Sequence, residues 1–189
     1  MSSLLDGLMQ QLGGDTLRQL GTRIGADPAS TQQAVSAALP ALLGALARNA
    51  QTPDGAAALA GALERDHDGS ALQDIAATLG GGSGAGILKH VFGGRQEAVQ
   101  QGVGAATGLS GSQAGQLLTM LAPLVMGALG SAKRARGLDA GGLAAMLGQE
   151  RASLGSGGGL GGLLQLIDRD GDGSVVDDLG GMLGRMLGR

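Results

Sequence analysis

The chain has 189 residues, of which 13 are basic and 16 acidic, and it contains no cysteine. This length is enough for one domain with a core of its own. The absence of cysteine excludes disulfides, thiolate catalysis and the common structural zinc sites. Because basic and acidic residues nearly balance, the chain offers no strong field for nucleic acid, and we expect no nucleic-acid partner.

The core must be built from small and aliphatic side chains. The sequence has no Trp, no Tyr and one Phe, against 39 glycines. Small side chains let helices approach closely, but each buries little apolar area. Alternating runs of Val, Ile or Thr, which are typical of strands, are nearly absent. The sequence therefore predicts an all-α fold, organised as a multihelical array.

The first residues, MSSLLDGLMQQLGG, contain neither a basic segment nor a long apolar segment. We therefore expect no signal peptide and a cytoplasmic location. The longest apolar runs, residues 34–47 and 117–132, are shorter than the roughly 18 to 20 residues of a membrane span, and each contains proline and glycine. They are typical of buried helices.

Two parts of the chain resemble each other. The stretch QAVSAALPALLGAL aligns with QLLTMLAPLVMGAL, which places Pro123 83 residues after Pro40. The two copies extend over about residues 20–66 and 103–151, so the sequence predicts an internal two-fold repeat. A proline inside a helix removes a hydrogen bond, so we expect each long helix to be kinked or split there, with proline at the first position of the second piece.

The composition changes after residue 151. Residues 152–162 are rich in Gly and Ser, which predicts a flexible linker between a domain of residues 1–151 and a tail of residues 163–189. We expect the tail to form a helix, a loop and a second helix. In the second helix one apolar face recurs at helical spacing, and its residues are Leu179, Met182, Leu183, Met186 and Leu187.

The loop of the tail, DRDGDGSVVDDL, resembles the calcium-binding loop of EF-hands. Asp168, Asp170 and Asp172 take positions 1, 3 and 5 of that pattern, and a glycine takes the sharp turn at position 6. Calcium is a hard cation that requires several oxygen ligands, and alternating aspartates converge their carboxylates. The stretch predicts a Ca²⁺ site whose ligands are Asp168, Asp170, Asp172, Ser174, Asp177 and Asp178.

This calcium pattern is incomplete, and it has an alternative. Position 12, normally a bidentate Glu, is Leu179. A second stretch, ERDHDGSALQDI from Glu64, aligns with the first without a gap but offers poorer ligands. In both stretches a serine followed three residues later by a polar residue also forms a helix capping box, which needs no ion. Capping does not account for three alternating aspartates, because their mutual repulsion destabilises the loop unless a cation lies among them.

Residues suited to catalysis are few. His67 and His90 are the two histidines of the chain, so neither a nucleophilic triad nor a His-rich metal centre can be assembled. Lys89, His90 and Arg95 gather near the one Phe, either as an anion or partner site or as a helix end whose basic side chains meet exposed carbonyls. We favour the helix end, and we expect no enzyme; a carboxylate-based site is the lower-ranked alternative.

Three segments and a mid-helix proline carry a resemblance to a known family. HDGS at residues 67–70, GAGILKHVFGG at 84–94 and AVQQGVGAATGLS at 98–110 occur in the order found in the YidB-like family of bacterial proteins of unknown function, DUF937. The resemblance extends from the N-terminus to about residue 150. It implies a multihelical, all-α domain, and it implies no activity, so no catalytic residue is carried over.

The function class that fits best is a non-enzymatic module that associates with itself or with another protein and carries Ca²⁺ in its tail. Helices rich in Ala, Gly and Leu present self-complementary faces, which suits contact between copies. The alternative is a membrane-associated protein whose apolar hairpins or tail helix insert into a bilayer.

Overall fold

The structure is a computed structural model that describes residues 4–66 and 75–156. All regular structure in these two ranges is helical, which confirms the predicted all-α class. The helices follow one another as α1 (Leu4–Gln11), α2 (Gly14–Ile24), α3 (Pro28–Asn49), α4 (Pro53–Asp66), α6 (Ile75–Gly80), α7 (Gly84–Phe92), the 3₁₀ helix η1 (Gly93–Arg95), α8 (Gln96–Thr107), α9 (Gly111–Arg136) and α10 (Ala140–Ser156).

The chain divides into two units, residues 1–151 and 152–189. α10 continues to Ser156, past the predicted start of the linker at residue 152. The rest of the predicted linker and the predicted tail lie outside the described residues, so their division stays a prediction. The helices that surround α9 belong to the first unit, and this unit holds the core.

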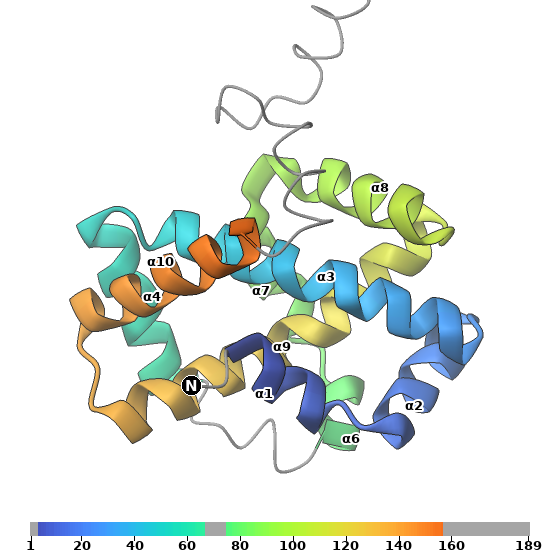
Figure 1. Ribbon diagram of the computed structural model, residues 1–189, viewed down its shortest axis with the longest axis horizontal. Helices are drawn as coiled ribbons and strands as arrows, with labels where there is room; N and C mark the ends of the chain where they lie inside the picture. The colour runs from blue at the N-terminus through green and yellow to red at the C-terminus, as the bar shows by residue number, and fades with distance from the viewer. Residues whose placement is uncertain (1–3, 67–74, 157–189) are drawn as a thin grey trace, which may run out of the picture. The chain divides into compact units, whose positions relative to one another are not determined.

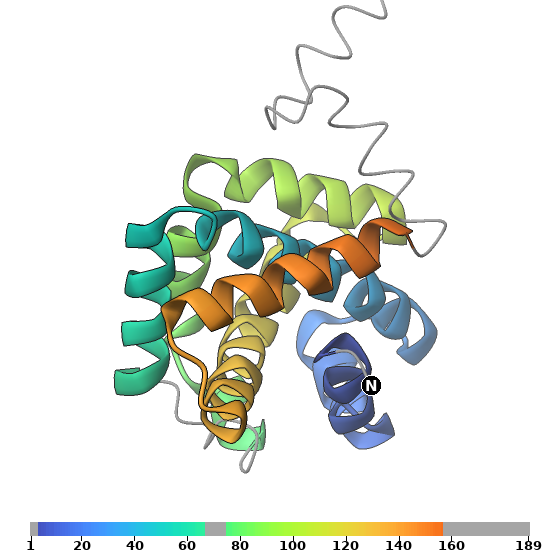
Figure 2. The ribbon, with the colours of Figure 1, turned by 60° about the vertical axis from the view of Figure 1, so that its left-hand side comes forward.

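α9 is the central helix of the first unit (Figures 1 and 2), and it packs against α1, α2, α3, α4, α6, α7 and α8. Every residue from 121 to 130 is buried. Leucine and alanine fill the core as the composition predicts, and Phe92 in α7 is the one aromatic residue among them. Burial on all sides explains why residues 121–130 in the middle of α9 include no polar side chain.

The two long helices were predicted to be kinked or split at their prolines, and the predicted split is wrong. α3 continues through Pro40 and α9 continues through Pro123, each as one helix. Each proline removes one backbone donor, yet the surrounding turns are largely buried: near Pro40, Leu39 and Leu42 have exposures of 0% and 1%. Tertiary packing of the flanking turns therefore offsets the missing hydrogen bond.

Helix boundaries recur along the chain at the offset of the predicted repeat. α2 ends at Gly25 and α8 ends at Gly108, both in the left-handed region with φ of 68° and 74°. Glycine adopts this conformation without steric conflict because it has no Cβ. Two residues later, Asp27 caps α3 and Ser110 caps α9. Gly25 and Gly108 lie 83 residues apart, as do Asp27 and Ser110. The repeat itself stays a prediction.

Glycine brings α7 and α8 close to neighbouring backbone. A Cβ on Gly84 of α7 would overlap the carbonyl oxygen of Thr119 in α9. Pro123 has no N–H to donate to that same carbonyl, so α7 lies over the point where the hydrogen-bond ladder of α9 lacks a donor. In α8, a Cβ on Gly104 would lie 2.7 Å from the carbonyl oxygen of Leu109.

Gly84→Ala tests whether this close approach holds the core together. We expect the substitution to lower the free energy of unfolding by about 3 kcal/mol, because α7 must move away from α9 to admit a methyl group. Gly86 lies in the same helix with nothing within 4 Å of its Cβ position. Gly86→Ala should be neutral or stabilising by up to about 1 kcal/mol. Urea unfolding followed by circular dichroism measures both, and equal effects would contradict the packing argument.

Candidate functional site

The six predicted calcium ligands lie outside the described residues. They are Asp168, Asp170, Asp172, Ser174, Asp177 and Asp178. The Ca²⁺ site of the tail therefore stays a prediction from the sequence. In the part of the chain that the structure describes, no group of three His, Asp or Glu side chains is placed to hold a metal ion.

The second acidic stretch begins inside α4, and its first residue already has a partner. Glu64 accepts a hydrogen bond from Lys133 Nζ at 2.6 Å, and the pair joins the C-terminal parts of α4 and α9. The side chain of Lys133 is 11% exposed, so the lysine is largely enclosed with its charge directed at Glu64. Residues 67–74 of this stretch lie outside the described residues. Oε1 of the carboxylate at position 1 of this stretch is therefore already paired with Lys133.

The ion pair changes the protonation of Glu64. The hydrogen bond from Lys133, and then the charge of the ammonium, lower the pKa of the Glu64 carboxyl below its ordinary value. A carboxyl whose pKa is lower in the folded state contributes stability that is complete above its unfolded pKa. That contribution is lost as the pH falls through the lowered pKa.

The basic cluster of the sequence lies at the C-terminal end of α7, on the surface. Lys89, His90 and Arg95 are all exposed. His90 Nδ1 lies 2.9 Å from the carbonyl oxygen of Gly86, so the ring donates to its own helix. The cluster lies at a helix end, as expected, but the last carbonyls of α7 accept hydrogen bonds from another helix. Asn49 Nδ2 of α3 donates to the carbonyl oxygens of residues 90 and 91, at 3.3 and 3.1 Å. No sequence pattern around Asn49 indicates this role.

Two other long side chains cap helices to which they do not belong. Gln113 Nε2 in α9 donates to the carbonyl oxygen of Ile24 at the end of α2, at 3.0 Å. Arg23 Nη1 in α2 donates to the carbonyl oxygen of Leu79 in α6, at 2.8 Å. The last carbonyls of a helix have no partner within it. These three caps therefore fix how the ends of α2, α6 and α7 meet other helices.

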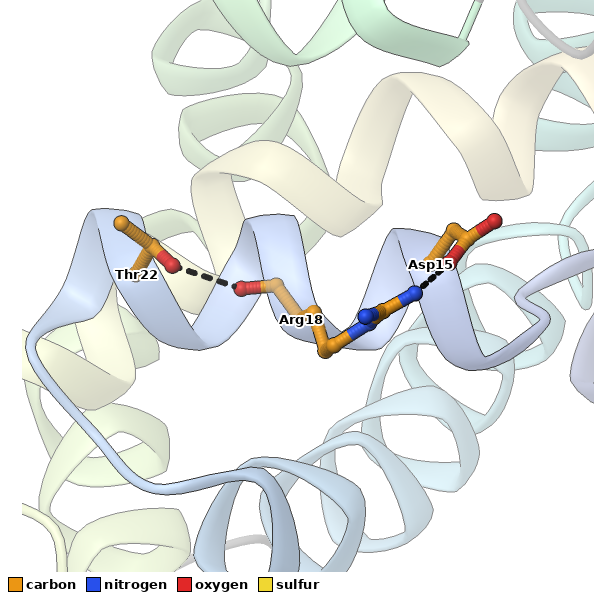
Figure 3. Close-up of polar contacts among 3 residues, drawn as sticks. All are labelled: Asp15, Arg18 and Thr22. Carbon is orange, nitrogen blue, oxygen red and sulfur yellow. Dashed lines mark hydrogen bonds and ion pairs between the residues drawn. The ribbon is translucent and has the colours of Figure 1, made fainter.

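α2 presents a polar face to solvent (Figure 3). Arg18 forms an ion pair with Asp15 one turn earlier, and Thr22 Oγ1 donates to the carbonyl oxygen of Arg18 at 2.9 Å. The side chains of Asp15 and Arg18 are both well exposed. Such an exposed pair contributes little to stability, so this face reads as ordinary solvated surface.

The positions of α8 that lie 83 residues later are different. Ala98, Gly102 and Ala105 are exposed there, where α2 has Asp15, Gln19 and Thr22. α8 therefore exposes small side chains along a face that is polar in α2.

The core of the described residues leaves no polar side chain without a partner. Its buried polar residues are two threonines that bond to their own helices. Thr31 Oγ1 donates to the carbonyl oxygen of Asp27 at 2.8 Å, and Thr107 Oγ1 donates to that of Val103 at 2.7 Å. Buried polar groups of this kind are structural, because their hydrogen-bonding capacity is used within the fold.

The chain belongs to the family described as bacterial protein of unknown function (DUF937), whose model matches residues 6–132. The match covers the helices from α1 to most of α9 and ends before α10. No curated protein and no solved structure matches the chain. The resemblance drawn from the sequence is confirmed at the level of the family, and the family assigns no activity.

Glu64→Gln tests the ion pair between α4 and α9. We expect the variant to be less stable than the unmodified chain at neutral pH, because Lys133 loses its negative partner. The difference should shrink as the pH falls through the lowered pKa of Glu64, because the carboxyl of the unmodified chain then becomes protonated. Urea midpoints across this range measure it, with Asp66→Asn as a control that removes one exposed carboxylate nearby. A difference independent of pH would rule out the charge as its cause.

Proposed function

We propose that this member of the DUF937 family is a non-enzymatic helical binding or assembly module with a Ca²⁺ site in its C-terminal loop. The observation that carries the proposal is the spacing of Asp168, Asp170 and Asp172 before a glycine turn. A cation among these carboxylates would relieve their repulsion and fix the direction of the predicted helix that begins at Leu179.

The body of the protein supports a scaffold role. In the described residues the buried polar side chains all have partners, and the basic cluster at the end of α7 lies on the surface. α9 is surrounded by other helices, and its packing depends on contacts too close to admit a methyl group. This arrangement favours a rigid body that presents surfaces over one that encloses a reacting substrate.

We further propose that the body is an internal duplication, in which α2, α3 and α4 correspond to α8, α9 and α10. The caps and the prolines recur at an offset of 83 residues. Gly21 in α2 and Gly104 in α8 recur at the same offset. A Cβ on either would come within 3 Å of a carbonyl oxygen five residues later, 2.9 Å from that of Ala26 and 2.7 Å from that of Leu109. A duplicated unit carries self-complementary faces, which supports association between copies of the chain.

Isothermal calorimetry of Ca²⁺ into the metal-stripped full-length chain tests the proposed site. We expect about one ion per chain at micromolar affinity, together with a raised thermal midpoint. The double variant Asp170→Ala/Asp172→Ala should lose both the binding heat and the rise in midpoint, because it removes two of the carboxylates that ligate the ion.

A matched double variant controls for net charge. Asp15→Ala/Asp54→Ala removes two carboxylates from the first turns of α2 and α4 and should leave Ca²⁺ binding unchanged. Calcium binding that survives in the tail variant, or that is absent from the unmodified chain, would sink the proposed site. The aspartates would then act as helix caps.

Membrane association is the second candidate, and one observation favours it. α9 is long and apolar enough to cross a bilayer, although 78% of its most apolar window is buried inside the first unit. If the protein acts at membranes, it should float with anionic liposomes in a density gradient, with and without Ca²⁺. Recovery of the chain in the lipid-free fraction under both conditions would remove this candidate.

A further inference from the structure

The sequence of the tail matches a longer segment of the body than the acidic stretches alone. ERDHDGSALQDIAATLG, residues 64–80, aligns without a gap with DRDGDGSVVDDLGGMLG, residues 168–184. The match continues through α6, so Ile75 corresponds to Leu179 and Leu79 corresponds to Leu183. In the proposed duplication, residues 179–184 are therefore the counterpart of α6.

α6 is held on α9 by its apolar side (Figure 1). Leu79 is 4% exposed and Ile75, one turn earlier on the same side of the helix, is half-buried. Arg23 Nη1 donates to the carbonyl oxygen of Leu79, at the end of α6. Since α6 belongs to the first half of the duplication and α9 to the second, this packing joins the two halves.

Other contacts between the two halves occur in corresponding pairs. At the offset of 83 residues, α1 and α2 correspond to α7 and α8. α1 and α2 pack against α9, and α7 and α8 pack against α3, which is the counterpart of α9. Such reciprocity is the property of a two-fold interface, in which each contact is accompanied by its converse. The converse of the contact between α6 and α9 is a contact between residues 179–184 and α3.

α3 is less covered than α9 at equivalent positions. Ala41 and Gly44 of α3 are half-buried, whereas Leu124 and Gly127, which lie 83 residues later in α9, are buried. The Cβ position of Gly44 has no atom within 4 Å. α3 therefore has open surface at a level where α9 is enclosed.

From these observations we propose that residues 179–184 dock on α3 of their own chain, as α6 docks on α9. Leu179 and Leu183 then take the places of Ile75 and Leu79. Residues 157–178 connect α10 to this segment, and an extended chain of that length spans about 70 Å, more than the width of a domain of this size. The inference rests on the proposed duplication, which it completes, and it gives the apolar face of the tail a partner within the chain.

Cross-linking in the full-length chain tests the docking, because the protein has no cysteine of its own. Gly44→Cys/Met182→Cys places one thiol on the open surface of α3 and one on the tail, where Met182 corresponds to the half-buried Thr78 of α6. With Ca²⁺ present, a short bismaleimide should join the two thiols within single chains, and peptide mapping identifies the link. Circular dichroism checks that the variant keeps the helix content of the unmodified chain.

Two further variants separate docking from chance collision. Gly102→Cys/Met182→Cys is the matched control, because Gly102 of α8 is exposed and also has no atom within 4 Å of its Cβ position. This pair should lose the link. Adding Leu183→Ser to the first pair should also abolish the link, because Leu183 corresponds to the buried Leu79.

Three results would overturn the docking: equal linking in the two cysteine pairs, a link that survives Leu183→Ser, and a link found only between chains. Calorimetry of Ca²⁺ into the same variants separates this failure from that of the calcium site. A chain that binds Ca²⁺ but forms no link between positions 44 and 182 keeps its ion site and loses the docking.

Discussion

The close approach of helices to α9 is the constraint on which the rest of this structure depends. With one Phe and no Trp or Tyr, the protein cannot fill wide spaces between helices, and its leucines and alanines bury enough area only where backbones come near. Gly84 of α7 allows such an approach to the backbone of α9. Gly104 of α8 allows the backbone at Leu109, in the turn before α9, to come equally near. The interhelical caps and the ion pair between Glu64 and Lys133 form at the ends of helices that this packing around α9 brings together.

Side-chain hydrogen bonds between helices add to the packing of the core in fixing the positions of the helices. Asn49, Gln113 and Arg23 each satisfy carbonyls at the end of another helix, and Glu64 with Lys133 joins the ends of α4 and α9. Contacts between small apolar side chains depend little on direction, so they do not determine how two helices are aligned. Hydrogen bonds at helix ends have a defined geometry and fix which turns of neighbouring helices are in contact. The same polar residues are thereby occupied in contacts that hold the helices together.

The helices, the buried apolar runs and the family were predictable from periodicity, composition and motif order. The capping box of Ser110 and Gln113 was also predictable, because Ser-x-x-Gln is its sequence signature. The continuity of α3 and α9 through proline was not predictable, because local chemistry favours a break and only tertiary burial restores the helix. The partners of Asn49 and Glu64 lie 41 and 69 residues away, and no local pattern announces such contacts.

The central claim is that the body serves as a rigid scaffold while the tail carries the ligand site. Amide hydrogen exchange of the full-length chain, measured by mass spectrometry with and without Ca²⁺, tests this claim most directly. The account predicts slower exchange in residues 163–189 when Ca²⁺ is present, with the slowest amides in α9 unchanged. Equal exchange of the tail in both conditions, or a Ca²⁺ effect confined to the body, would contradict it.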